Sequence, residues 1–265
     1  MKIGFIGAGN MATAIIRGAV GSKNFNSSDI LAYDIDEKKA NFLNEKYKIT
    51  TKSSVSGLIN ACDVVVLAVK PNVLKELLEL NRDSFMIKSP LIISIAAGKE
   101  LKFYEEILNY NARLVRVMPN INATVNEAMS AYCFNSNVSD KDKSLVELLC
   151  NSFGNSTYLD EKFFPCFGVL AGCSPAFAFM FIDSLATAAV KSGMNKEIAL
   201  NIAAQTVLGS AKLILESSDH PYKLVDAVCS PGGTTIEGVV ALKDEGFDAA
   251  IIKAFDASLD KDKRV

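Results

Sequence analysis

The first twenty residues, MKIGFIGAGNMATAIIRGAV, constrain the fold more than any other stretch. Residues 2–7 are typical of a short buried strand, and residues 11–20 have the spacing of an amphipathic helix. In the turn between them, Gly7 permits a tight bend and Gly9 lets the backbone approach a phosphate closely. Unpaired N–H groups and the helix dipole both favour negative charge at such a helix start. The pattern predicts a pyrophosphate site in a dinucleotide-binding fold, with an ordinary strand–helix turn as the alternative.

Composition narrows the functions open to the chain. Its 265 residues suffice for two domains, and the net charge of −2 leaves no basic surface for nucleic acid, so we expect no nucleic-acid partner. The one histidine, His220, is expected to be solvated or to cap a helix, and it argues against a histidine-rich metal site or a Ser-His-Asp triad. We therefore expect no metal, and an enzyme built on this chain would take its chemistry from a bound cofactor.

Neither the cysteines nor the apolar stretches indicate export or a membrane. The six cysteines are scattered without a C-x-x-C pair, and with no secretory signal they are typical of reduced, buried thiols in the cytoplasm. Residues 163–182 are uncharged and long enough to span a membrane, but Pro165, Gly168, Gly172 and Pro175 interrupt them. We expect a buried helix of a soluble protein there and no membrane contact.

Residues 29–34 are predicted to form a second strand that ends in Asp34. In dinucleotide-binding folds an acid at this strand end accepts hydrogen bonds from the adenosine ribose and repels a 2′-phosphate, so Asp34 favours NADH over NADPH. Lys38 and Lys39 follow closely and could contact a phosphate instead. In the alternative interpretation Asp34 caps the next helix and has no part in cofactor binding.

Strands and helices alternate through the first half of the chain. Residues 63–69 are predicted as a central parallel strand because they are apolar on both faces, residues 91–98 as another buried strand and residues 113–120 as a further strand. The alternation predicts a parallel, doubly wound sheet with right-handed crossovers in an N-terminal domain over residues 1–157. Ligands of such sheets lie beyond the carboxyl ends of the strands, so residues 68–71 are expected to form a wall of the cofactor site.

The second half of the chain has a different pattern. No convincing strand follows about residue 158, and we expect a helical domain over residues 158–265. Two long helices are predicted, one over residues 175–192, closed by Gly193, and one that Asn195 caps and that runs to about Glu216. Both are apolar on more than one face and need a partner surface, for which a second copy of the chain is the simplest candidate.

A second glycine turn, SPGGTT at residues 230–235, precedes an apolar helix predicted over residues 236–243. Its backbone N–H groups suit a carboxylate, and the hydroxyls of Ser230, Thr234 and Thr235 can add donors. Alone, the turn is better explained as a plain N-cap formed by Thr234 or Thr235. Beside a cofactor site, a pocket for a substrate carboxylate becomes the better interpretation.

Six segments carry a resemblance to a known family. They are Gly4 to Ala14 (GFIGAGNMATA), Ala68 to Pro71 (AVKP), Val115 to Asn120 (VRVMPN), Leu170 to Phe177 (LAGCSPAF), Gln205 to Lys212 (QTVLGSAK) and Asp226 to Thr235 (DAVCSPGGTT). Through them the chain resembles pyrroline-5-carboxylate reductases over nearly its full length, and the last segment is highly specific. The chain departs from the family at Asn120-Ile121-Asn122, where N-T-P is usual, and at Gly172-Cys173-Ser174-Pro175, where G-S-G-P is usual.

The resemblance implies NAD(P)H-dependent reduction of the cyclic imine 1-pyrroline-5-carboxylate to L-proline. It also implies a Rossmann domain followed by a helical domain that forms homodimers by interleaving, with larger assemblies such as a decamer. We expect the cofactor, NADPH or NADH, to contact Ile6, Gly7, Ala8, Gly9, Asn10, Met11, Asp34, Ala68, Val69, Lys70, Pro71 and Asn120. We expect the carboxylate of the cyclic imino acid to bind Ser230, Gly232, Gly233 and Thr234, and Thr235 to be the catalytic residue that hydrogen-bonds near the imine nitrogen.

Three rival functions fit the same architecture. A reductase of a different imine would use the same sites. A β-hydroxyacid dehydrogenase would need a lysine in the helical domain as acid and base, for which Lys191 is the candidate, although it lies near the end of its predicted helix. A non-catalytic NAD(P)-binding regulator is disfavoured by the intact SPGGTT turn. Lys70 and Arg116 are interpreted as charges at strand ends.

Overall fold

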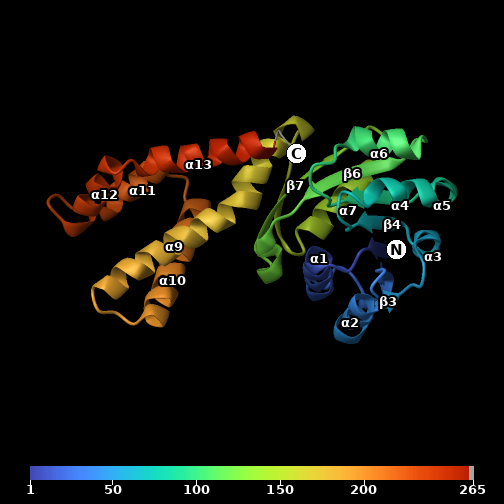
Figure 1. Cartoon of the computed structure of the whole chain (residues 1–265), viewed down its shortest axis with the longest axis horizontal. Coiled ribbons are helices and arrows are strands. Elements are labelled where there is room, and N and C mark those ends of the chain that lie inside the picture. The colour runs from blue at the N-terminus through green and yellow to red at the C-terminus, as the bar shows by residue number, and fades with distance from the viewer. Residues whose placement is uncertain (263–265) are drawn as a thin grey trace. The chain divides into compact units, whose positions relative to one another are not determined.

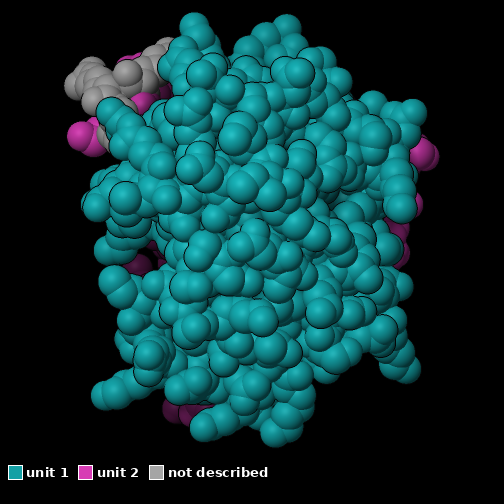
Figure 2. Space-filling model, turned by 90° about the vertical axis from the view of Figure 1, so that its right-hand side faces the viewer, with its two compact units in different colours: residues 1–172, 265 teal, residues 173–264 magenta. Residues whose placement is uncertain are grey.

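The structure is a computed structural model that describes residues 1–262. It divides into two compact units, unit 1 over Met1–Gly172 and unit 2 from Cys173 onward (Figure 1), and Figure 2 shows one face of unit 1 in space-filling form. The domain boundary expected after residue 157 stays a prediction, and residues 263–265 of the expected helical domain lie outside the described residues.

Unit 1 is built on one sheet, whose order in the described part of the chain is β3-β2-β1-β4-β5-β6-β7-β8. The strands are β1 (Ile3–Ile6), β2 (Ile30–Tyr33), β3 (Thr50–Thr51), β4 (Val64–Leu67), β5 (Leu91–Ser94), β6 (Arg113–Met118), β7 (Ala128–Phe134) and β8 (Gly154–Tyr158). The strand order reverses at β1, which pairs in parallel with both β2 and β4. In such sheets the ligand lies at this switch point, beyond the carboxyl ends of the strands.

The predicted doubly wound architecture is confirmed, with one pair of strands that differs from the expected parallel arrangement. β6 and β7 run antiparallel. The link between them holds only the short 3-10 helix η2 (Ile121–Val125), whereas a parallel connection needs a crossover of a dozen or more residues, usually with an α-helix. The strands from β3 to β6 and the pair β7–β8 are parallel.

Helices cover both faces of this sheet. They are α1 (Asn10–Gly21), η1 (Ser27–Asp29), α2 (Glu37–Tyr47), α3 (Val55–Ala61), α4 (Leu74–Leu80), α5 (Arg82–Lys88), α6 (Leu101–Leu108), α7 (Asp140–Cys150), η3 (Glu161–Phe163), α8 (Phe164–Phe167) and the π-helix η4 (Gly168–Cys173). Among them α3, α5, α8, η1, η3 and η4 were not predicted as separate elements from the sequence. The burial expected for the cysteines holds for Cys62, Cys133 and Cys150 but is wrong for Cys166 and Cys173, which are exposed.

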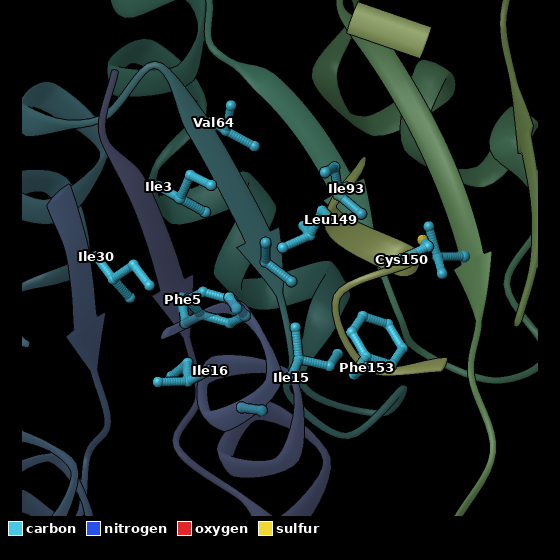
Figure 3. Close-up of a cluster of buried hydrophobic side chains, with 14 of the residues drawn as sticks. Ile3, Phe5, Ile15, Ile16, Ile30, Val64, Ile93, Leu149, Cys150 and Phe153 are labelled. Atoms are coloured by element: carbon cyan, nitrogen blue, oxygen red, sulfur yellow. The ribbon is translucent and has the colours of Figure 1, made fainter. Parts of the chain in front are cut away.

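Alternate residues of the central strands enter two separate hydrophobic clusters. Val64 and Val66 of β4 belong to the cluster beneath α1 and α7, which Figure 3 shows with Phe5, Ile15 and Phe153 in it. The intervening β4 residues belong to the second cluster, beneath α3 to α6. Burial on both faces is why these strands are apolar throughout rather than alternating.

Unit 2 is helical in its described residues. It contains α9 (Ser174–Lys191), α10 (Lys196–Glu216), α11 (Pro221–Val228), α12 (Thr234–Asp244) and α13 (Phe247–Asp262). Gly193, with φ of +93°, follows α9, and the Asn195 side chain caps α10 by accepting N–H bonds from Glu197 and Ile198, as the sequence predicts.

The long helices of unit 2 are poorly covered within a single chain. Residues 161–191 and 196–216 are long and apolar enough to cross a membrane by length and composition alone. The burial expected for residues 163–182 holds only in part. Phe164 and Phe167 are buried, but Phe163 and Leu170 are exposed. In α9, Phe179 and Met180 are exposed as well. The apolar character of α9 is evident from the sequence. Whether its apolar side chains are buried by the same chain or by another chain is not.

Candidate active site

The turn from β1 to α1 leaves an open helix start at the switch point of the sheet. Gly7 has φ of +104°, its N–H donates to the Tyr33 carbonyl at 2.8 Å, and a Cβ on it would lie 2.5 Å from the Ala68 carbonyl oxygen. Gly9, the N-cap of α1, has φ of −73° and no side-chain cap, and a Cβ on it would meet no atom within 4 Å. Because the first N–H groups of a helix have no partner within it, this start offers donors facing open space, which fits the diphosphate of a dinucleotide.

Asp34 lies beside this turn and is held by two backbone groups. Its Oδ2 accepts the Ala8 N–H at 2.7 Å, and its Oδ1 accepts the Asp36 N–H at 2.9 Å. The alternative in which Asp34 caps the next helix is wrong, because Asp36 is the N-cap of α2 and accepts the Lys38 N–H. The carboxylate therefore belongs to the wall of the turn rather than to the helix.

Two cavities meet at Asp34. The first, of about 300 Å³, has an apolar lining that includes Val55, Val69 and Leu77, and it also touches Ile6 and Gly7. The second, of about 390 Å³, is lined by polar residues: Glu37, Asn41, Thr51, Lys52 and Ser53. Tyr33, Asp34 and Ile35 line both. An apolar cavity of this size beside a helix start suits an adenine ring.

The residues that were predicted to contact the cofactor after β4 and after β6 differ in their surroundings. The Ala68 N–H donates to the Ile6 carbonyl at 2.8 Å, which fixes the end of β4 against the glycine turn, while exposed Lys70 and half-buried Pro71 lead into α4. Asn120 is buried, and its side chain is used within the protein: Nδ2 donates to the Ala171 carbonyl at 3.0 Å and Oδ1 accepts the Met129 N–H at 3.3 Å. Contact of Asn120 with the cofactor stays a prediction.

Arg116 is not the strand-end charge that the sequence suggested. It is 5% exposed in the interior of β6, donates to Glu161 Oε1 at 3.0 Å, and its guanidinium carbon lies 4.4 Å from the ring centroid of Phe164. The same Glu161 oxygen accepts the Leu101 N–H at the start of α6. The pair ties β6, α6 and η3 together, and a charged residue inside the apolar strand LVRVM was the signal that could have revealed it.

The turn at residues 230–235 in unit 2 is a second open helix start. Gly232 has φ of +66°, the Gly233 N–H donates to the Ser230 carbonyl at 3.0 Å, and Gly233 is the N-cap of α12. The plain-cap interpretation is wrong, because α12 has no side-chain cap and Thr234 and Thr235 are its first two helical residues. Both threonines are exposed in the single chain, and the part of their hydroxyls in substrate binding stays a prediction.

The other two candidate residues of unit 2, His220 and Lys191, lie at helix ends. His220 is the N-cap of α11, and its Nδ1 accepts the Tyr222 N–H at 3.2 Å, as one expectation had it. Lys191 is the last residue of α9. Within residues 1–262, no group of three or more His, Cys, Asp or Glu side chains is placed to hold a metal ion.

Known proteins match both parts of the chain. A family model described as pyrroline-5-carboxylate reductase dimerisation matches residues 161–265, and one described as NADP oxidoreductase coenzyme F420-dependent matches residues 2–98. The pyrroline-5-carboxylate reductase of Escherichia coli (strain K12) is 38% identical over 270 residues, covering 100% of this chain and 98% of the relative.

Two solved structures have the same fold over the whole chain. The pyrroline-5-carboxylate reductase of Coxiella burnetii has a TM-score of 0.94 at 31% identity and covers 99% of this chain and 97% of its own. The pyrroline carboxylate reductase of Plasmodium falciparum, solved with NADP bound, has a TM-score of 0.88 at 31% identity and covers 100% of this chain and 97% of its own.

Proposed function

The chain belongs to the pyrroline-5-carboxylate reductase family, and from that membership we propose how its own residues divide the work of the reaction. It is an oxidoreductase that uses NAD(P)H to reduce 1-pyrroline-5-carboxylate to L-proline, the last step of proline biosynthesis. The observation that supports the proposal most strongly is the presence of two open helix starts, one in each unit, both with glycine at the N-cap.

The nucleotide binds at the carboxyl edge of the sheet in unit 1. The backbone of residues 6–11 and the start of α1 hold the diphosphate, Asp34 accepts from the ribose hydroxyls, and residues 68–71 with Asn120 complete the wall. The open space in front of Gly9, where an added Cβ would meet no atom within 4 Å, supports binding of a phosphate there. When bound, the nicotinamide supplies the hydride that reduces the imine carbon.

The substrate carboxylate binds at the start of α12. The N–H groups of Gly232, Gly233 and Thr234 and the hydroxyl of Ser230 are the donors, because a helix start favours an anion. Binding through the carboxylate orients the ring and leaves the imine free to face the nucleotide.

Thr235 acts at the imine nitrogen. Its hydroxyl can accept from a protonated iminium or donate to a neutral imine, so one side chain serves both protonation states. A protonated iminium is already electrophilic, and no strong general acid is needed. This agrees with a sequence that holds one histidine, used as a helix cap.

Replacing Thr235 tests this assignment. Thr235→Val removes the hydroxyl at constant shape, and the loss of one hydrogen bond to a charged group, about 1.5–3 kcal/mol, is expected to lower kcat/KM by roughly 10- to 100-fold. Thr235→Ser keeps the hydroxyl and should retain most of the activity. Steady-state oxidation of NADH with 1-pyrroline-5-carboxylate measures both, and unchanged kcat/KM in Thr235→Val would show that Thr235 has no such role.

The enzyme works as a homo-oligomer assembled through unit 2. The exposed apolar side chains on its helices include Phe179, Met180, Ile198, Ile202 and Leu208. A second copy would cover them, forming a homodimer that can assemble further, for example into a decamer, in the cytoplasm. Sedimentation analysis should find no substantial 28.5 kDa species at micromolar concentration, and a stable monomer would contradict the dimer.

A further inference from the structure

The carboxylate of Asp34, at the end of β2, is held in place by two backbone hydrogen bonds. Both of its carboxylate oxygens accept a backbone N–H, one from Ala8 in the glycine turn and one from Asp36, at 2.7 and 2.9 Å. Resting on the proposed function, we propose that this anchored carboxylate makes the enzyme select NADH over NADPH.

The two backbone hydrogen bonds determine how the Asp34 carboxylate can interact with a ligand. Each carboxylate oxygen has two acceptor directions, and one on each is taken by the backbone, which leaves further acceptor capacity for a ligand. The side chain cannot turn away without losing both N–H partners. It therefore presents a fixed acceptor, which suits the hydroxyl donors of an adenosine ribose and opposes the oxygens of a 2′-phosphate.

The two cavities meet at Asp34, where the ribose of NADH and that of NADPH would differ by the 2′-phosphate. The apolar cavity, with Val55, Val69 and Leu77 in its lining, suits adenine, and Ile35 adds an apolar side chain that is 91% exposed on the lip. Asp34 lines both this cavity and the polar one next to it. A ribose bound to Asp34 would direct a 2′-phosphate into the polar cavity.

The charges of the polar cavity oppose a phosphate. Its lining contains two carboxylates, Asp34 and Glu37, against one ammonium group, that of Lys52. Lys38 and Lys39, the cations that the sequence offered as a rival phosphate site, are not in this lining, and Lys39 Nζ lies 3.9 Å from Asp36 Oδ2. A 2′-phosphate carries a charge near −2 at neutral pH, so NADPH meets net repulsion where NADH meets an acceptor.

Measuring the affinity for each nucleotide directly tests the selection of NADH over NADPH without catalysis. Isothermal titration of the full-length protein with NADH and with NADPH should give a Kd for NADH at least about tenfold lower. Asp34→Asn should remove the repulsion and shift the ratio of the two Kd values toward NADPH by about tenfold or more. Asp36→Asn is the matched control, because asparagine keeps the helix cap and Asp36 lies outside the cavity lining; it should change the ratio by less than about threefold.

The possible outcomes separate the selection from the function on which it rests. A wild-type protein that binds NADPH as tightly as NADH, or a ratio that Asp34→Asn leaves unchanged, would overturn the selection while leaving the reductase intact. If Lys52→Met weakened NADPH about tenfold and spared NADH, Lys52 would be a phosphate receptor and the proposal would be wrong. Binding of neither nucleotide would instead overturn the proposed function itself.

Discussion

Gly9→Ala separates nucleotide binding from stability. The new methyl group would meet no atom within 4 Å, and the φ of −73° at Gly9 is accessible to alanine. Alanine is a poorer N-cap than glycine by roughly 0.5–1 kcal/mol, while the less flexible unfolded chain returns about 0.4–1 kcal/mol. The free energy of unfolding without ligand should therefore change by less than about 1 kcal/mol.

Nucleotide binding should respond very differently to the same change. The methyl group would occupy the open space in front of the helix start, where the diphosphate approaches the backbone. Losing one charge-assisted hydrogen bond there, about 1.5–3 kcal/mol, raises the Kd for NADH roughly 10- to 100-fold. Calorimetric titration gives the Kd, and chemical denaturation of the unliganded protein gives the stability.

Gly7→Ala is the matched contrast. Its Cβ would lie 2.5 Å from the Ala68 carbonyl oxygen, and alanine would be strained at a φ of +104°. Strain and overpacking together should lower the stability by roughly 2–5 kcal/mol. If Gly9→Ala bound NADH as tightly as the wild type does, or destabilised the protein as much as Gly7→Ala, the diphosphate site would be misplaced.

Two further predictions concern the stability of unit 1. Phe153 is fully buried beneath the sheet (Figure 3), and Phe153→Ala should cost about 3–5 kcal/mol in chemical denaturation; a cost under about 1 kcal/mol would mean that the cluster does not stabilise the fold. Burial alone would raise the pKa of Asp142, but hydrogen bonds from Ser139 and from Arg113, at 2.8 Å, hold that pKa below its ordinary value of 3.8. A lowered folded-state pKa stabilises the protein above the unfolded-state pKa, so the contribution should be complete at neutral pH and lost as the pH falls below about 4. Asp142→Asn should flatten this acid-side loss in denaturation curves from pH 3 to 7, and an unchanged slope would refute the assignment.

Turns and helix caps could be predicted from the sequence because they depend on interactions between residues close together in the chain. An apolar strand followed by glycines and a helix is compatible with few structures other than a tight turn. Gly7 has the positive φ that this turn needs. Asn195 and His220 cap helices because side-chain acceptors near a helix start find free N–H groups within a few residues. The short helices α3 and α5 were missed because seven residues carry too little periodicity to identify a helix.

Contacts between distant residues could not be predicted in the same way. The antiparallel pairing of β7 follows from the short link after Met118, but the strand pattern alone does not give a direction. The bond from Ala8 to Asp34 joins residues far apart in the chain, and the sequence placed Asp34 near the ribose without showing what holds it. Arg116 was assigned to a strand end because its partner Glu161 lies in another part of the chain.

Isotope transfer between the two ligands tests the central claim most directly. The full-length protein would be given NADH dideuterated at C4 of the nicotinamide together with 1-pyrroline-5-carboxylate, and the product would be analysed by mass spectrometry. If the nucleotide and the imino acid are held against each other, L-proline should carry one deuterium atom, on the carbon that was the imine carbon. Oxidation of NADH without deuterium in proline, or tight binding of NADH with no proline formed, would contradict the proposed reaction.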